Sequence, residues 1–365
     1  MIQRICSSLA LLFLFMTICF AQNRRAANME VIAYYSGGSE GIDKYKVEEL
    51  TQIIFSFGHL KGNRLHISNA RDTGRIQKLV SLKQRNPKLK VLLSLGGWGG
   101  CAPCSDVFST VEGTNEFALS VKQLLDYFKA DGIDLDWEYP AIEGHPGHAY
   151  KKEDKANFTS LVQALRNTLG EKAIISFAAG GFDKFLQESI DWQSVMPVIN
   201  YVNLMSYDLV SGFSTVTGHH TPLYSNNTQK QSADNAIRYF DSIKVPLQKV
   251  IIGAAFYART WENVKDVNNG LYQQGNFKHF ISYSQFDQRL NKDSGFVYYR
   301  DSIAKAPYAY NKRTNTFATF DDEASVAEKV KYVKQHQLGG IMFWELSLDK
   351  PVNGLLSIIN KEKNK

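Results

Sequence analysis

Short apolar runs alternate with amphipathic stretches along most of the chain. Between several of the runs lie segments with a helical period, such as 115–131 and 155–170. Apolar strands that alternate with helices predict an α/β fold, here a parallel (β/α)8 barrel. An open doubly wound sheet usually has a phosphate-binding glycine turn after its first strand, whereas this chain reads YYSGGSEG there. The expected strands are 30–36, 52–58, 90–97, 132–138, 173–180, 201–208, 249–257 and 339–346.

One connection is much longer than the others. Between Tyr257 and a helical stretch at 322–337 lie several aromatic, strand-like runs. A structureless loop of that length is uncommon inside a compact domain. We therefore expect a small α+β insertion over 261–320, after the seventh strand of a barrel formed by 22–260 and 321–365.

The first 21 residues have the three-part order of a secretory signal peptide. Arg4 precedes an apolar run that ends at the small residue Ala21. The run is short for a membrane anchor, and no later stretch is long and apolar enough to span a bilayer. We predict cleavage near Ala21–Gln22 and a secreted protein, extracellular or, in a Gram-negative bacterium, periplasmic.

Cys101 and Cys104 are the cysteines that remain after residues 1–21, in the sequence GGCAPCS. Such a pair can be a redox site, half of a zinc site or a small structural disulfide. No second CxxC or HxxxH follows, and an exported chain favours oxidation. We therefore predict a local disulfide and no metal.

The formal net charge of +6 is spread along the chain. Scattered Lys and Arg indicate ordinary solubility, with no nucleic-acid or membrane partner. We also expect a monomer without a cofactor. The 18 Tyr, 22 Phe and 5 Trp permit a sugar-binding cleft, because such clefts use aromatic faces, but they do not establish one.

The segment DGIDLDWEYP, residues 131–140, carries the clearest candidate chemistry. At strand period, Asp134, Asp136 and Glu138 share one face, and the apolar residues between them share the other. The outer face of a barrel packs on helices, so the acids should point inward. Glu138 comes last, at the carboxyl end of the strand, where barrel active sites form.

Carboxylates stacked away from water cannot all stay ionised. A proton shared along the row raises some pKa values and can keep Glu138 protonated as a general acid near neutral pH. A hard-cation site would more often draw ligands from several loops. An exposed acidic strand would not carry Ile, Leu and Trp. The pattern therefore favours a catalytic acid.

DGIDLDWEYP resembles the DxxDxDxE signature of glycoside hydrolase family 18, the chitinase family. The resemblance extends in order to LLSLGGW, LMSYD, GAAFYART and GGIMFWEL, and so covers nearly the whole chain after residue 21. The expected insertion resembles the α+β domain that deepens the cleft in one chitinase subfamily.

The resemblance implies a retaining mechanism in which the substrate supplies the nucleophile. Glu138 would protonate the glycosidic oxygen, and the N-acetyl carbonyl would attack the anomeric carbon to form an oxazolinium. Asp136 would hold the acetamido N–H and share its proton with Asp134. Tyr207 would donate its hydroxyl to the acetamido oxygen, and Trp344 would form the stacking floor.

The same resemblance implies a set of further positions along the sugar cleft. They are Asp208 in the sugar pocket, Trp98 on the leaving-group side, Tyr34 near the acid row, Arg259 reaching the cleft, and Met205, Tyr139 and Phe57 along its wall. His145 and His148 could suggest a metal pair, but after the acid strand we expect them to line or stiffen a loop.

We therefore expect a secreted chitinase that cleaves β-1,4-linked N-acetylglucosamine chains. An endo-β-N-acetylglucosaminidase acting on N-glycans is the competing possibility within the enzymes, although those relatives are generally shorter and lack the insertion. A chitinase-like lectin is the possibility from another class, but such proteins usually lose the acid Glu or a supporting Asp. A peptidoglycan-directed enzyme would often carry cell-wall-binding repeats.

Overall fold

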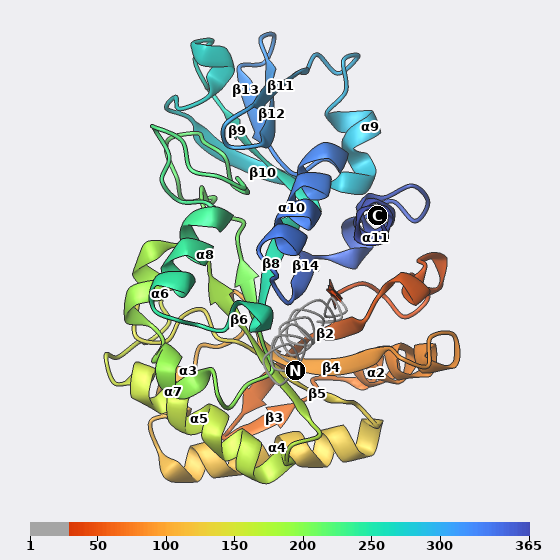
Figure 1. The fold of residues 1–365 in the computed structure, drawn as a ribbon, viewed down its shortest axis with the longest axis vertical. Coiled ribbons are helices and arrows are strands. Elements are labelled where there is room, and N and C mark those ends of the chain that lie inside the picture. The colour runs from red at the N-terminus through yellow and green to blue at the C-terminus, as the bar shows by residue number, and fades with distance from the viewer. Residues whose placement is uncertain (1–28) are drawn as a thin grey trace, which may run out of the picture.

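The computed structural model describes residues 29–365, and the predicted signal peptide lies outside the described residues. Eight parallel strands pair side by side, and the last pairs with the first to close a barrel (Figure 1). This confirms the predicted (β/α)8 fold. In their order around the barrel the strands are β1 (Glu30–Tyr35), β2 (Gln52–Lys61), β4 (Lys90–Gly96), β5 (Gly132–Asp136), β6 (Ile174–Gly180), β7 (Tyr201–Met205), β8 (Val250–Ala255) and β14 (Gly340–Trp344).

Helices cover the outside of the barrel. The longest, α4, begins where the Thr110 side chain accepts a hydrogen bond from Gly113 N, and it ends at Lys129 in the left-handed conformation. The first connection contains only short 3-10 turns, and β3 (Arg64–His66) forms a hairpin with β2. The helices are α2 (Ala70–Ser81), α3 (Cys104–Val107), α4 (Val111–Phe128), α5 (Asp154–Leu169), α6 (Asp183–Glu188), α7 (Trp192–Val195), α8 (Ala233–Ser242), α9 (Phe286–Arg289), α10 (Glu323–Gln335) and α11 (Leu355–Lys363).

The core has two layers, as the period-two pattern of the strands predicts. The apolar residues of β5 point outward, and Trp137, just beyond it, lies 5.6 Å from Phe108 and 6.4 Å from Phe158 between ring centroids. Inside the barrel, Ile54 and Met342 belong to a separate buried cluster. The acidic side chains of β5 therefore share the barrel interior with an apolar inner cluster.

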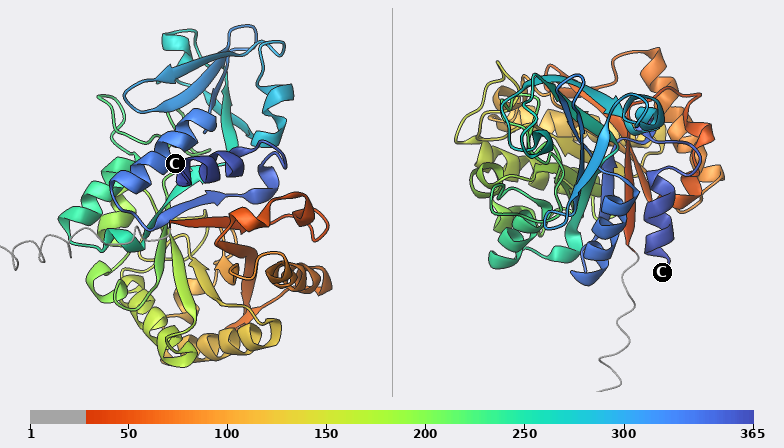
Figure 2. Two further views of the ribbon diagram at one scale, coloured as in Figure 1. Left: turned by 45° about the vertical axis from the view of Figure 1, so that its right-hand side comes forward. Right: turned by 90° about the horizontal axis from the view of Figure 1, so that it is seen from above.

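A second, antiparallel sheet stands at the carboxyl end of the barrel (Figures 1 and 2). Trp261, Tyr310 and Phe317 form its own buried core. The sheet begins at Tyr257, before the expected boundary at 261. The residues from Gly253 to Tyr257 form one apolar run, and this run hides the break at Phe256 from a reading of the sequence. In spatial order its strands are β10 (Asn276–Ser282), β9 (Tyr257–Glu262), β13 (Thr316–Thr319), β12 (Ala306–Asn311) and β11 (Val297–Asp301).

No helix within residues 29–365 is long and apolar enough to cross a membrane.

Candidate active site

Asp134 lies at the base of the acid row and receives hydrogen bonds from four different strands. Its carboxylate accepts from the hydroxyls of Tyr34 (3.0 Å), Ser94 (3.0 Å) and Ser176 (2.6 Å), and from Asn203 Nδ2 (3.0 Å). Burial raises the pKa of Asp134, whereas these hydrogen bonds act in the opposite direction. The barrel interior is therefore built around this side chain.

Asp136 and Glu138 continue the row toward the cleft. Burial, followed by the charges of Glu138 and Asp134, raises the pKa of Asp136 well above its ordinary value. Oδ1 of Asp136 is buried and has no hydrogen-bond partner among the described residues. It is thus free to accept a donor from a ligand.

Glu138 has the pKa of a general acid at neutral pH. Burial raises it to about 7; a hydrogen bond with Tyr139 opposes this, and the charge of Asp208 adds to it. A carboxyl group with this pKa keeps its proton in weakly acidic solution and can transfer it to a leaving oxygen.

Two glycines let β4 close against the acid strand. Gly96 has φ of +109°, and a Cβ atom there would lie 2.1 Å from the carbonyl oxygen of Asp136. Gly97, with φ of +79°, donates its N–H to the same oxygen at 3.0 Å. The glycine pair in LLSLGGW therefore supports the backbone that presents Asp136.

Asp208 lies beyond the end of β7, two strands from β5 around the barrel. Its carboxylate accepts from Nε and Nη2 of Arg259 and from the Tyr257 hydroxyl at 2.8 Å, and His220 Nδ1 lies 3.3 Å away. Burial alone would raise the pKa of Asp208, but the hydrogen bonds from Arg259 and His220 hold it well below its usual range. Asp208 is therefore ionised at neutral pH.

Tyr257 and His220 belong to the site but were not predicted from the sequence. Tyr257 lies inside the motif GAAFYART, so the motif itself was its signal. His220 is fully buried, and burial is the main cause that lowers its pKa. In the sequence it stands only as one of two adjacent histidines in a polar loop.

Tyr207 follows β7 and faces the acid row. It is buried, its hydroxyl lies 3.8 Å from Met342 Sδ, and its ring meets Tyr257 edge to face at 6.4 Å. Burial raises its pKa well above the ordinary value. The phenol therefore stays protonated and can donate a hydrogen bond.

The floor of the cleft is aromatic. The Trp344 indole stacks on Phe57 with ring centroids 5.6 Å apart and tilts against Tyr34 at 5.8 Å. Met205 is partly buried against the same inner cluster. Flat apolar faces at the end of the barrel can receive the face of a sugar ring.

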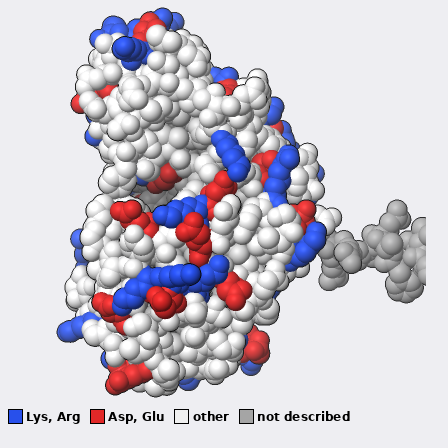
Figure 3. All heavy atoms as spheres, turned by 90° about the vertical axis from the view of Figure 1, so that its left-hand side faces the viewer, with Lys and Arg blue, Asp and Glu red and all other residues white. Residues whose placement is uncertain are grey.

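Trp98 lies at the edge of the cleft, on the loop after β4. Its side chain is 40% exposed and approaches Tyr139 at 6.4 Å and Phe213 at 5.9 Å. A cavity of about 570 Å³ is lined by Phe57, Trp98 and the glycines around them. Figure 3 shows a hollow between the second sheet and the barrel, with Asp and Glu side chains in and beside it.

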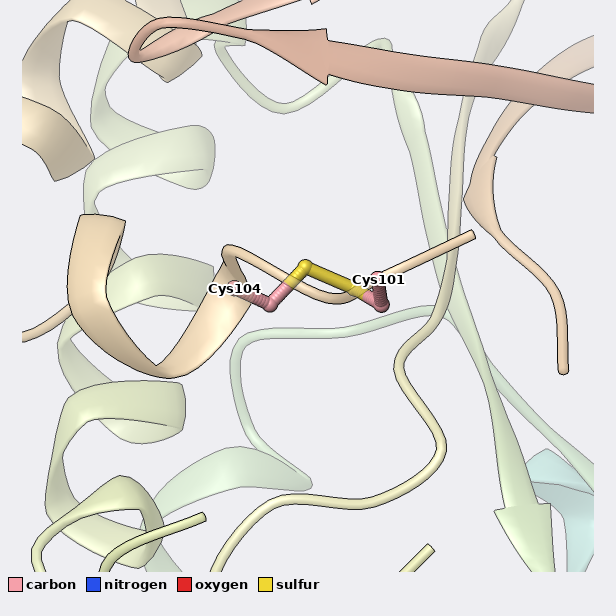
Figure 4. The surroundings of a disulfide bond; sticks show 2 residues. All are labelled: Cys101 and Cys104. Atoms are coloured by element: carbon pink, nitrogen blue, oxygen red, sulfur yellow. A yellow bond between two sulfur atoms is a disulfide. The ribbon is translucent and has the colours of Figure 1, made fainter. Parts of the chain in front are cut away.

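The loop beyond Trp98 is closed by the predicted disulfide. Cys101 and Cys104 are bonded, with their Cα atoms 5.2 Å apart, at the start of α3 (Figure 4). Both cysteines are buried. The disulfide prediction is confirmed, and the bond closes the short turn that follows the cleft glycines and Trp98.

Most of the predicted site residues lie at or beyond the carboxyl ends of the barrel strands, whereas Asp134 lies within β5, Phe57 within β2 and Arg259 on β9 of the second sheet. A parallel barrel with a row of carboxyl groups, a Glu with a pKa of about 7 and an aromatic floor has the components of a glycoside hydrolase. The family model for "Glycosyl hydrolases family 18" matches residues 30–349. The chain therefore belongs to glycosyl hydrolase family 18.

Two curated relatives show how much of each chain is shared. Chitinase A1 of Niallia circulans is 32% identical over an alignment of 302 residues, and the match covers 76% of this chain and 43% of that protein. Chitotriosidase-1 of Mus musculus is 31% identical over 82% of this chain and 67% of its own length. The chain thus spans less than half of the bacterial relative.

A solved structure is similar over its full length. It is a glycoside hydrolase family 18 N-acetylglucosaminidase from Paenibacillus barengoltzii, 34% identical, with a TM-score of 0.83, and the match covers 92% of this chain and all of that one. Chitinase ChiA74 from Bacillus thuringiensis has a TM-score of 0.85 at 25% identity, covering 92% of this chain and 70% of that chain.

Proposed function

We propose that this protein is a chitinase that hydrolyses β-1,4-N-acetylglucosamine linkages in chitin or chito-oligosaccharides. The observation that carries the proposal is Glu138, a cleft carboxyl group whose pKa is raised to about 7 beside a supporting pair of buried aspartates. The similarity to Chitinase A1 supports the choice of substrate.

The proposed reaction retains the anomeric configuration and uses the substrate's acetamido group. Glu138 gives its proton to the glycosidic oxygen while the acetamido carbonyl attacks the anomeric carbon, so that the glycosidic bond breaks and an oxazolinium forms. The unpartnered Oδ1 of Asp136 accepts the acetamido N–H, and the Tyr207 hydroxyl donates to the acetamido oxygen. Water, deprotonated by Glu138, then opens the oxazolinium.

The remaining cleft residues have proposed binding roles. Trp344 and Phe57 form the floor beneath the distorted sugar, and the Asp208–Arg259 pair offers polar contacts beyond the end of β7. Trp98 stacks on sugars at the leaving-group side. The apolar floor and charged walls suit a chain of amphipathic sugar rings.

We also propose that the protein acts outside the cytoplasm as a monomer. The support is the secretory pattern of residues 1–21 and the Cys101–Cys104 disulfide, a bond typical of oxidising compartments.

An N-acetylglucosaminidase that releases single sugars is the second candidate, because the N-acetylglucosaminidase from Paenibacillus barengoltzii matches along its whole length. Endo-β-N-acetylglucosaminidase action on N-glycans and lectin-like binding are two weaker candidates. Lectin-like binding is disfavoured because Asp134, Asp136 and Glu138 are all present.

Product analysis separates these functions. Wild-type protein is incubated with labelled chitohexaose and, separately, with a high-mannose glycopeptide. We expect chitohexaose to be cut into dimers and longer oligomers, and the glycopeptide to stay intact. Glu138→Gln should abolish cleavage, a loss of at least about 10²-fold, while chitohexaose still binds.

Each competing function would give a different result in these assays. Sequential release of monomer alone would indicate the N-acetylglucosaminidase, and glycan release without oligomer cleavage would indicate action on N-glycans. Binding without turnover by the wild type would indicate a lectin. Ordinary activity in Glu138→Gln would overturn the assignment of the acid.

A further inference from the structure

The loop after the acid strand carries two histidines that the proposed reaction does not use. Gly144 lies against the strand end, since a Cβ atom there would be 2.1 Å from Glu138 O. His145 N approaches the same oxygen at 3.5 Å, and His148 N donates to His145 O at 3.0 Å. The loop is therefore fixed directly to the backbone of the catalytic acid.

The His145 side chain has a defined orientation. Its Nδ1 lies 2.9 Å from the carbonyl oxygen of Pro146, and because a carbonyl can only accept, Nδ1 carries the proton and donates it. The ring also lies close to the ring of His148, with centroids 4.4 Å apart and an interplanar angle of 32°. The imidazole is thus held from two sides.

The other contact of the imidazole is with Trp98. The two rings meet at 5.5 Å with an interplanar angle of 61°, an edge-to-face arrangement of the favourable kind. Trp98 is 40% exposed, and its other aromatic neighbour on the solvent side, Phe213, is itself 67% exposed. A partly buried ring on a fixed loop restrains the indole more firmly than an exposed Phe213 can.

We propose that His145 is a positioning residue that braces the Trp98 indole as a stacking platform for sugars on the leaving-group side. The inference rests on the proposed function, which makes Trp98 a sugar-binding residue. The edge-to-face contact fixes the tilt of the indole without covering both of its faces. His145 thereby connects the loop that follows Glu138 to the residue that binds the leaving-group sugars, Trp98.

A double-mutant cycle on two substrates tests this inference. His145→Ala, Trp98→Ala and the double variant are compared on chitohexaose and on an aryl chitobioside, whose leaving group contains no sugar. We expect His145→Ala to raise KM for chitohexaose by about two- to tenfold, the range of one aromatic contact. The increase should be smaller on the aryl substrate, and the double variant should be no worse than Trp98→Ala.

Two further variants separate bracing from a general structural effect. His145→Phe keeps an aromatic ring at the contact and should return KM for chitohexaose toward the wild-type value. Tyr150→Ala removes an aromatic side chain that is 48% exposed from the same connection, and it should leave both substrates unchanged.

Several results would overturn the inference. Additive effects of His145→Ala and Trp98→Ala would mean that His145 does not act through Trp98, and equal losses on both substrates would mean a structural role. An unchanged KM for chitohexaose in Trp98→Ala would show that Trp98 does not bind sugars, which contradicts this inference but not the proposed hydrolysis. A wild-type protein that cleaves neither substrate would instead contradict the proposed function, and this inference with it.

Discussion

The three acids of the β5 row are chemically alike, and their neighbours divide their roles. Asp134 has four donors around its carboxylate, which favour its ionised form. Asp136 keeps one oxygen free, and Glu138 lies close enough to the ionised Asp208 for that charge to raise its pKa. Burial raises the pKa of both Asp136 and Glu138, so protons are held most firmly on the two acids nearest the cleft, where a leaving group would need one.

Asp208 contributes to this placement through its charge, and this leads to a testable pH dependence. Asp208→Asn removes a negative charge that raises the pKa of Glu138, and it leaves the Arg259 cation without its partner. Both changes favour ionised Glu138, so its pKa should fall. Since the acid must be protonated to act, the alkaline limb of kcat/KM, expected near pH 7 in the wild type, should move to lower pH.

The control for this pH shift is Asp287→Asn. It also removes one negative charge, but the Asp287 side chain is 75% exposed and solvent screens it. Its alkaline limb should coincide with that of the wild type. An Asp208→Asn limb that stays in place or moves to higher pH would contradict the electrostatic role of Asp208.

Part of this site was predictable residue by residue, and part was not. Glu138 and its supporting acids follow from strand period, because Asp134 and Asp136 lie on β5 and Glu138 comes two residues after its end. The donors to Asp134 come from strands far apart in the sequence, so no local motif joins them. A signal did exist, since Ser94, Ser176 and Asn203 are each a polar residue inside an otherwise apolar strand.

At the level of elements, a buried ion pair ties the second sheet to the barrel. Lys329 on α10 donates to Asp321 Oδ2 at 2.6 Å, and both side chains are fully buried. Asp321 follows β13, and its Oδ2 also accepts from Ala255 N, at the end of β8, at 3.0 Å. One carboxylate therefore joins both connections between the barrel and the second sheet.

Breaking this pair should be costly. Lys329→Met leaves Asp321 charged and buried without its partner, and we expect a loss of about 3 to 5 kcal/mol in the free energy of unfolding. Urea unfolding at pH 7 measures the loss. The double variant Lys329→Met/Asp321→Asn, which removes both charges, should recover part of it.

Lys331→Met is the matched control, because Lys331 lies on the same helix and pairs with Glu328 at the surface. Its effect should be much smaller, since exposed ion pairs contribute little. A Lys329→Met variant that is as stable as Lys331→Met would show that the buried pair does not hold the sheet in place.

The elements themselves were largely predictable because the barrel strands are apolar and separated by amphipathic helices. The start of the second sheet was not, since the apolar run from Gly253 to Tyr257 passes through the boundary without a turn residue. The buried Lys329–Asp321 ion pair could not be predicted from the sequence either. Ionisable residues in or near a predicted helix are ordinarily read as surface residues, and only the tertiary packing of α10 against the barrel buries this pair.

For the molecule as a whole, the burial that keeps Glu138 protonated for catalysis also lowers the free energy of unfolding at a pH where Glu138 must ionise. The folded protein holds the proton of Glu138 up to a pH of about 7, whereas the ordinary pKa of Glu is 4.5. Between these values the folded state binds more protons than the unfolded chain. The stability linked to this proton is therefore complete below the unfolded pKa and is lost as the pH rises through the folded pKa.

Glu138→Gln should therefore stabilise the protein in a pH-dependent way. Gln cannot ionise, so the variant does not lose this contribution, and its free energy of unfolding relative to the wild type should be greater at pH 8 than at pH 4.5 by about 1 to 3 kcal/mol. Urea unfolding of both proteins at the two pH values measures the difference, and taking the difference cancels the titration of groups common to both. Glu143→Gln, at an exposed position in the following loop, should give the same difference at both pH values. A pH-independent effect of Glu138→Gln would mean that the cleft does not disfavour the charge of its acid, and the explanation given for the protonated Glu138 would then be wrong.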